Sequence, residues 1–181
     1  MSEESFNYVG ERFADLQMLR YRLDDFDKLT LRQKSLIYCL AKATLYGRDI
    51  TFDEFGKYNL KIRKTLEAVF CLYKGNRNCA DFEALTVYMK RVWFSNGIYH
   101  HYGTEKFEPG FSEEFFRKAV KSVDARRLPI DDGSVDALLN EICPVIFDPT
   151  ILPKRVNKAD GEDLIRTSAC NYYSGVSQRE V

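Results

Sequence analysis

The chain has 181 residues, with 27 basic side chains against 27 acidic ones, so its formal net charge is zero. It is 45% apolar and 30% charged, which is ordinary for a globular protein and too apolar for a disordered one. The balanced charge argues against a dedicated nucleic-acid binder, and no apolar run approaches the roughly 20 residues that a membrane span needs. The length predicts a single domain over residues 1–181.

Apolar residues near the N-terminus recur mostly at helical spacing, which predicts helices. The first predicted helix covers residues 6–22. A capping box that starts at Thr30 opens a second helix, and Gly47 is expected to end it. Residues 48–58 are then predicted to be a connector that contains a short strand over residues 50–52.

Four more helices are predicted further along the chain, each with its own start or stop signal. They cover residues 62–73, ended by Gly75; residues 82–93, ended by the Asn96-Gly97 turn; a stretch begun by Ser112; and a stretch begun by Ser134. Pro144 is expected to begin an extended passage that continues past Pro153, because proline keeps its predecessor out of the α region. Asp160 is expected to cap one more helix over residues 162–169. The fold class is therefore predicted to be mainly α, with about six or seven helices and little or no β-strand.

The last residues contain a second capping-box pattern, at residues 177–180, directly before Val181. A helix start signal with no helix behind it predicts that the domain is truncated at its C-terminal end. Chance is the alternative, because S-x-x-E is a common tetrapeptide. A truncated end would either fray or pack against another copy of the chain, so self-association is one expected outcome.

Cysteine usage and the N-terminus bear on the compartment. The five cysteines are scattered and form no C-x-x-C pair, which favours reduced thiols in a cytosol-like compartment. The acidic N-terminus carries no apolar leader segment. A cytoplasmic location is therefore expected, with a periplasmic one as the alternative if a signal peptide has been removed.

The residues that could hold a catalytic metal are few. His100 and His101 are the only histidines and they are adjacent, so on a strand their side chains would point to opposite faces. No H-E-x-x-H pattern, G-x-S-x-G elbow or Gly-rich phosphate loop is present. The sequence therefore predicts no metal site and no catalytic residue within this chain.

Residues 96–111 form a loop that is rich in Tyr, His and Gly, and two interpretations of it stay open. It could be a cleft wall whose aromatic faces pack against a ligand, with Asn96, His101 and Lys106 as hydrogen-bond donors. It could equally be a loop whose aromatic residues fix it to the helices while the polar side chains face water. A second aromatic cluster, at residues 171–175, poses the same choice.

Three blocks, in order along the chain, resemble the dipeptidyl peptidase III family of zinc exopeptidases, most closely its bacterial branch. Residues 38–47, YCLAKATLYG, are similar to a family helix that ends in small residues, an aromatic and Gly. Residues 96–107 are similar to the more specific pattern S-N-x-G-N-Y-x-x-[FY]-G-x-x-K-F. Residues 172–175, YYSG, resemble the family stretch Y-[FY]-S-G. His100 and His101 depart from the pattern, since other branches carry less ionisable residues there.

The resemblance implies a two-lobed enzyme that releases dipeptides from the N-termini of short peptides. Its Zn²⁺ is held by an H-E-x-x-G-H or H-E-x-x-x-G-H helix plus a distant Glu. None of these residues is in this chain, so the resemblance assigns the chain to the lobe opposite the zinc, with the remaining lobes of the same protein as its partners. The chain alone is then expected to be inactive.

For individual residues, the resemblance implies that Tyr102 borders the substrate subsites. Asn96, His101 and Lys106 are further candidates for contacts with the peptide substrate. The alternative function is a different class, a self-contained helical protein-interaction module without catalytic activity.

Overall fold

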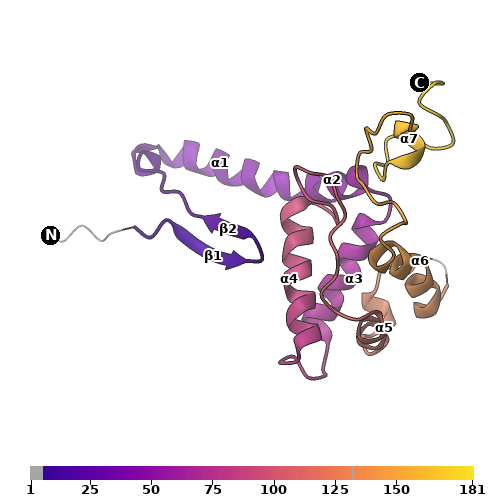
Figure 1. Cartoon of the computed structure of the whole chain (residues 1–181). Helices are drawn as coiled ribbons and strands as arrows, with labels where there is room; N and C mark the ends of the chain where they lie inside the picture. Colours follow the sequence, from indigo (N-terminus) through magenta and orange to yellow (C-terminus); the bar gives the residue numbers. More distant parts are fainter. Residues whose placement is uncertain (1–5, 132) are drawn as a thin grey trace. The chain divides into compact units, whose positions relative to one another are not determined.

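The computed structural model describes residues 6–131 and 133–181, and this part of the chain is mainly helical (Figure 1). The mainly α fold class is therefore confirmed. The chain divides into two compact units, Met1–Arg48 and Asp49–Val181, called unit 1 and unit 2 below. A single domain over residues 1–181 stays a prediction.

Unit 1 begins with a β-hairpin in place of the helix expected over residues 6–22. Strands β1 (Val9–Phe13) and β2 (Leu16–Leu19) pair antiparallel around a two-residue loop. Ala14 in this loop has a φ of 49°, a left-handed conformation that tight hairpin turns usually give to Gly, Asn or Asp. The expectation was wrong because the loop lacks the Asn-Gly or Asp-Gly pair that marks a hairpin, so the apolar spacing alone fits one continuous helix.

Helix α1 (Leu31–Thr44) follows a 3-10 turn (Phe26–Lys28) and starts at the predicted capping box. The backbone N–H of Gln33 donates to Thr30 Oγ1 at 3.3 Å, and the backbone N–H of Thr30 donates to Gln33 Oε1 at 2.9 Å. Both bonds satisfy backbone donors that a helix N-terminus otherwise leaves free. The capping box expected at Thr30 is confirmed.

Helix α2 (Arg48–Phe55) occupies most of the segment that was expected to be a connector with a short strand. A 3-10 turn (Leu45–Gly47) joins it to the end of α1. Gly47 is not among the glycines with positive φ, so it does not form the left-handed cap that would stop a helix. The expected stop at Gly47 and the expected strand over residues 50–52 were therefore wrong.

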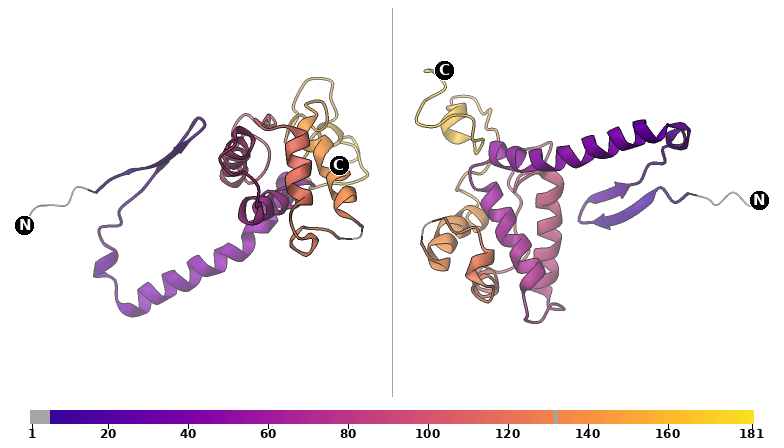
Figure 2. Two further views of the ribbon diagram at one scale, coloured as in Figure 1. Left: turned by 90° about the horizontal axis from the view of Figure 1, so that it is seen from below. Right: turned by 180° about the vertical axis from the view of Figure 1, so that it is seen from behind.

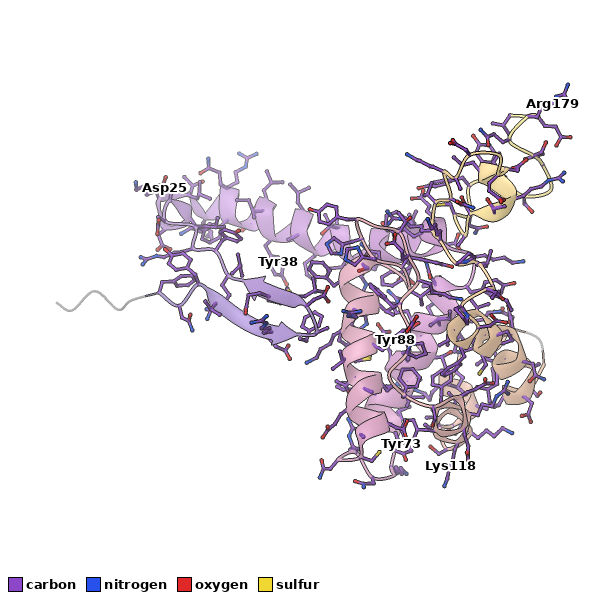
Figure 3. The ribbon with its side chains drawn as sticks, in the orientation of Figure 1. Asp25, Tyr38, Tyr73, Tyr88, Lys118 and Arg179 are labelled. Carbon is purple, nitrogen blue, oxygen red and sulfur yellow. The ribbon has the colours of Figure 1, made fainter. Side chains whose placement is uncertain are left out.

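Four helices build the interior of unit 2. Helices α3 (Asn59–Leu72) and α4 (Ala80–Ser95) lie side by side, and α5 (Glu113–Lys121) contacts both α3 and α6 (Val135–Phe147) (Figures 1 and 2). Tyr88 of α4 is 2% exposed and points into this interior (Figure 3). The largest fully buried side chains are Phe52, Phe116, Ile62, Leu66, Leu85, Met89, Ile98, Leu139, Ile142, Ile146, Val69 and Val92.

The start signals expected for α5 and α6 are confirmed. Ser112 Oγ accepts a hydrogen bond from the backbone N–H of Phe115 at 3.2 Å. Ser134 Oγ accepts one from the backbone N–H of Ala137 at 3.2 Å. A short 3-10 turn, Ala125–Arg127, lies between these two helices along the chain.

Helix α6 continues through Pro144, where an extended passage was expected to begin. Proline inside a helix removes one backbone donor and crowds the preceding turn. Cys143, Val145 and Ile146 on either side of it are all buried, and the burial of apolar side chains offsets that cost. The expected break at Pro144 was wrong because tertiary packing overrides the local preference.

An ion pair between a buried arginine and a half-exposed aspartate connects α2 to α3 within unit 2. Arg63 of α3 is 3% exposed, and its Nη2 donates to Asp49 Oδ1 at 2.8 Å. The guanidinium also lies over the ring of Phe52, 4.6 Å from its centroid. A buried cation needs such partners, so this contact fixes the position of α2 on α3.

The C-terminal part of unit 2 contains one short helix, α7 (Leu164–Thr167). Asp163 caps it, since its Oδ1 accepts from the backbone N–H groups of Ile165 and Arg166, each at 3.0 Å. The cap expected at Asp160 and the longer helix over residues 162–169 were wrong, because Asp163 provides the cap and the helix ends at Thr167.

At residues 177–180, some of the hydrogen bonds typical of a capping box are present. Glu180 Oε2 accepts from the backbone N–H of Ser177 at 2.7 Å and from Ser177 Oγ at 2.6 Å. These bonds close a turn over residues 178–180. Gln178 connects this turn to α7, because its Oε1 accepts from the backbone N–H of Leu164 at 2.9 Å.

Candidate functional site

The chain leaves α4 through a turn whose geometry depends on glycine. The turn expected at Asn96-Gly97 ends α4, and Asn96 caps the helix in the left-handed conformation, with a φ of 54°. Gly97 has a φ of 154°, and a Cβ at this position would collide with the side chain of Asn59. Asn59 is 1% exposed and its Oδ1 accepts from the backbone N–H of Ile98 at 3.2 Å. Asn96 therefore ends the helix. The packing of Gly97 against Asn59 fixes the direction in which the chain enters the aromatic segment.

Residues 98–107 then form a short antiparallel hairpin, called the aromatic hairpin below. Tyr99 bridges Lys106 across it, and the backbone N–H of Phe107 donates to the carbonyl of Ile98 at 2.8 Å. Ile98, Tyr99 and Phe107 are 1%, 2% and 6% exposed. Tyr99 also donates its hydroxyl to the carbonyl of Leu152 at 3.0 Å, and burial raises its pKa. The base of the hairpin is thus fixed in the core of unit 2.

The tip of the aromatic hairpin has the opposite character, because Tyr102 is 85% exposed. The backbone N–H groups of Tyr102 and Gly103 donate to His100 Nδ1 at 3.2 and 3.0 Å. These bonds hold the His100 ring against the backbone of the tip. The ring of His101 lies 4.5 Å from the rings of both His100 and Tyr102.

Lys106 lies at the base of the hairpin and not at its tip. Its Nζ donates to three backbone carbonyls at the end of α6 and just beyond, those of Val145 (2.9 Å), Asp148 (2.5 Å) and Ile151 (2.6 Å). An ammonium group in this position satisfies free carbonyls and complements the helix dipole. Burial lowers the pKa of Lys106, and the nearby Asp148 partly opposes this.

The four residues singled out from the sequence therefore separate into two groups. The structure brings His101 and Tyr102 together at the hairpin tip, whereas Asn96 ends α4 and Lys106 binds the end of α6. All three ammonium hydrogens of Lys106 have carbonyl acceptors, which favours a structural role for this residue. Substrate contacts for any of the four stay a prediction.

A groove of about 560 Å³ lies beside the hairpin tip and is called the hairpin groove below. Its lining combines the tip with a second segment of chain: Tyr102, Gly103, Thr104, Lys154, Arg155, Val156, Lys158 and Ala159. The backbone N–H of Arg155 donates to the carbonyl of Thr104 at 2.8 Å, and Thr104 Oγ1 donates to the carbonyl of Val156 at 3.2 Å. The two walls of the groove are thus joined by hydrogen bonds.

The basic residues that line this groove were not predicted from the sequence. Lys154 and Arg155 follow Pro153 directly, and Lys158 comes three residues later. A short basic run next to a proline is a detectable signal, yet charged stretches are most simply solvated surface. Backbone pairing between residues 104–106 and 153–155 brings these cations to Tyr102.

An apolar pocket of about 220 Å³ adjoins the same stretch of chain. Val156 lines both this pocket and the hairpin groove. The remaining lining residues come from the C-terminal part of unit 2: Leu164, Ile165, Ser168, Cys170, Tyr172 and Tyr173. The aromatic cluster at residues 171–175 therefore borders a pocket, with Tyr172 and Tyr173 each more than half exposed.

Potential metal ligands and reactive thiols are dispersed. No group of three or more His, Cys, Asp or Glu side chains that could hold a metal ion occurs among residues 6–131 and 133–181. All five cysteines carry free thiols; Cys39 and Cys71 are exposed, and Cys143 is buried. Burial raises the pKa of the Cys143 thiol to about 11, so this thiol is protonated and unreactive near neutral pH.

Neither a scan against protein-family models nor a search of curated proteins finds a match to this chain. Among the helices of the described residues, none has both the length and the apolar character that crossing a membrane requires.

Proposed function

We propose that this chain is the N-terminal helical portion of a zinc-dependent dipeptidyl peptidase that resembles the dipeptidyl peptidase III family. In this proposal the aromatic hairpin forms part of the wall of the substrate cleft, and Tyr102 packs against a side chain of the bound peptide. The remaining lobes of the same protein complete the cleft. This chain supplies substrate contacts and no catalytic residue.

One observation supports this role most directly, the contrast between the base and the tip of the aromatic hairpin. Tyr99 and Phe107 are buried, whereas Tyr102 is 85% exposed. An aromatic residue that fixed the loop to the helices would be buried like the first two. A large exposed aromatic on an anchored hairpin loses little conformational freedom on binding, which suits a ligand contact.

The zinc ion of the proposed enzyme belongs to residues outside this chain. In such peptidases the zinc polarises the carbonyl of the scissile bond and lowers the pKa of a bound water. The described residues offer no cluster of three potential metal ligands. The scattered free thiols favour a reducing compartment, so we assign the parent enzyme to the cytoplasm, with the periplasm as the alternative.

The test is Tyr102→Ala in the full-length enzyme. We expect kcat/KM for a dipeptidyl-naphthylamide substrate to fall about ten- to a hundred-fold, because one aromatic contact to the bound peptide is lost. The free energy of unfolding should change by less than about 0.5 kcal/mol, since the side chain is exposed. Steady-state kinetics and urea denaturation measure the two quantities.

Tyr21→Ala is a matched control, because Tyr21 is 79% exposed and lies outside the aromatic hairpin. It should leave both kcat/KM and stability unchanged. Tyr102→Ala that destabilises the protein without altering its kinetics would contradict the proposal and assign Tyr102 to the fold.

A second candidate function, the protein-interaction module, is supported by unit 1. Helix α1 carries apolar side chains that are at least 44% exposed: Leu31, Leu36, Ile37, Tyr38 and Leu40. Apolar side chains gathered on one helix are typical of interaction surfaces.

The gene sequence discriminates the two functions. A reading frame that continues beyond the codon for Val181 into an H-E-x-x-G-H segment favours the peptidase, and a stop codon there favours the module.

A further inference from the structure

The hairpin groove carries a concentration of positive charge that the proposed cleft wall does not by itself explain. Its lining includes Lys154, Arg155 and Lys158 and no acidic residue. Lys154 and Arg155 are held in an extended segment, because their carbonyls accept from the backbone N–H groups of Ala169 and Cys170 at 3.0 and 3.1 Å. The backbone that carries these cations is therefore ordered by hydrogen bonds on both sides.

Arg155 is preorganised by its contacts. Its guanidinium lies 4.3 Å from the centroid of the Phe55 ring, and Nη2 donates to the carbonyl of His101 at a long 3.4 Å. An arginine has five N–H donors in a planar fork that matches a carboxylate. Stacking on Phe55 holds the plane of this fork while leaving most of its donors for a ligand, which reduces the entropy cost of binding.

Among the described residues, the two lysines have no partner that would neutralise them. Within the described ranges, neither Lys154 nor Lys158 makes a side-chain hydrogen bond or an ion pair. The Glu105 carboxylate lies where a side chain on Gly103 would begin, and the Glu105 backbone bridges Lys154. The lining itself holds three cations and no carboxylate, which gives the groove a positive potential that attracts anions.

We propose that the hairpin groove binds the carboxylate of a short peptide, either its C-terminal carboxylate or an acidic side chain. Arg155 and the two lysines would hold the carboxylate, and Tyr102 would pack against the adjoining apolar part of the peptide. A groove of about 560 Å³ lies in the size range of sites that bind small ligands. That the carboxylate comes from a peptide rests on the proposed function of the aromatic hairpin. Inorganic phosphate has similar oxygen chemistry, so it is included in the test.

The experiment compares two tetrapeptides with the purified chain. The acidic peptide is Tyr-Ala-Glu-Glu with a free C-terminus, and the neutral one is Tyr-Ala-Gln-Gln with a C-terminal amide. Backbone amide signals of Thr104 and Arg155, followed by NMR, report the site and the dissociation constant. We expect the acidic peptide to bind about ten-fold more tightly or better at low salt, and this advantage to disappear near 1 M salt because of screening.

Charge-matched variants assign the effect to the groove. Lys154→Gln with Lys158→Gln should remove most of the preference for the acidic peptide. Lys74→Gln with Lys118→Gln removes the same charge from exposed positions outside the groove, where Lys118 projects from α5 (Figure 3), and should preserve the preference. Glu105→Gln should leave binding of the acidic peptide equal or tighter. Circular dichroism spectra of all variants should coincide, since none of the substituted side chains packs in the core of unit 2.

The inference is overturned if both peptides bind equally, or if the variant at Lys154 and Lys158 retains the preference. It is also overturned if inorganic phosphate shifts the same amide signals at lower concentration than the acidic peptide, because the groove would then be a phosphate site. If both peptides bind equally and their binding depends on Tyr102, the groove is not a carboxylate site, but the proposed role of the aromatic hairpin as a cleft wall stands. A preference that depends on the lysines, together with unchanged kinetics for Tyr102→Ala in the full-length enzyme, would keep the anion site and reject the peptidase cleft.

Discussion

Helices α1 and α3 both have 14 residues, but they are stabilised in different ways within their own units. In the described structure none of the residues of α1 is buried, and its N-terminus is closed by a complete capping box. Helix α3 buries seven residues, and its N-cap residue, Tyr58, makes no side-chain hydrogen bond to the helix. Helix α1 thus relies on local interactions and α3 on packing. The comparison shows that an apolar helical pattern predicts a helix without predicting what covers it.

The largest expected effect is a difference in the free energy of unfolding between two matched substitutions, one in each helix. Leu66→Ala in α3 removes a fully buried side chain and should lower the free energy of unfolding by roughly 3–4 kcal/mol through lost burial and a cavity. Leu40→Ala in α1 removes a side chain that is 58% exposed, so it should cost less than about 1 kcal/mol. Urea denaturation followed by the fluorescence of Trp93 and by circular dichroism measures both. Equal losses would break the comparison and show that α1 is covered in solution.

A polar contact should come next in size. Lys106→Met removes the ammonium group that binds three carbonyls around the end of α6, so we expect a loss of about 2–3 kcal/mol in stability. Lys118→Met, at an exposed lysine of α5, is the control and should cost less than about 0.5 kcal/mol. If Lys106→Met leaves stability unchanged and weakens binding of the neutral tetrapeptide, Lys106 is a ligand contact as the family resemblance implies.

A smaller effect is expected at the start of α1. Thr30→Ala removes the acceptor for the Gln33 backbone N–H and should destabilise α1 by about 1 kcal/mol. Because α1 depends on local interactions, its amide hydrogens should exchange about five-fold faster, while those of α3 should be unaffected. Thr30→Asn, which keeps a capping oxygen, serves as the control. Unchanged exchange in α1 would mean that tertiary contacts hold the helix.

The smallest effect concerns pH and remains local to α7. The pKa of Asp163 lies below its ordinary value of 3.8, chiefly because the backbone N–H of Arg166 donates to the carboxylate, with further bonds from Gln178 and Ile165. A carboxylate with a lowered pKa in the folded state stabilises it above pH 3.8, and the stabilisation is lost as the pH falls through the lowered value. Below pH 3.8, exchange at the amides of Arg166 and Gln178 should accelerate before the core of unit 2 unfolds. Asp163→Asn should remove this dependence.

Much of the fold could be predicted where the sequence and the packing agree. The starts of α5 and α6 follow from Ser112 and Ser134, and the end of α4 follows from the turn at Asn96. Apolar spacing predicts that α3 and α4 are helices. The β-hairpin of unit 1 could not be predicted, because Ala14 adopts a conformation that its side chain disfavours. Pro144 was misleading for the opposite reason, since burial around it outweighs a strong local preference.

The candidate site was predictable only in part. The composition of residues 96–107 drew attention to His101, and the family resemblance pointed to Tyr102. The structure brings the two side chains together. The same composition gave no way to distinguish Tyr99 in the core from Tyr102 on the surface, because both are tyrosines in one loop. Lys154 joins Tyr102 only through pairing between segments about fifty residues apart, and such pairing leaves no local pattern in a single sequence.

The unequal exposure of the thiols provides an experimental opportunity. Cys39 is exposed on α1 in unit 1, Cys71 is exposed on α3 in unit 2, and Cys143 is shielded by burial. A maleimide spin label should react first at Cys39 and Cys71 under mild conditions, since the other thiols are less accessible. Dipolar electron spin resonance would then measure the distance between the two labels. The natural sequence thus carries one attachment point in each unit, and a label pair on them reports directly how the units are arranged in solution.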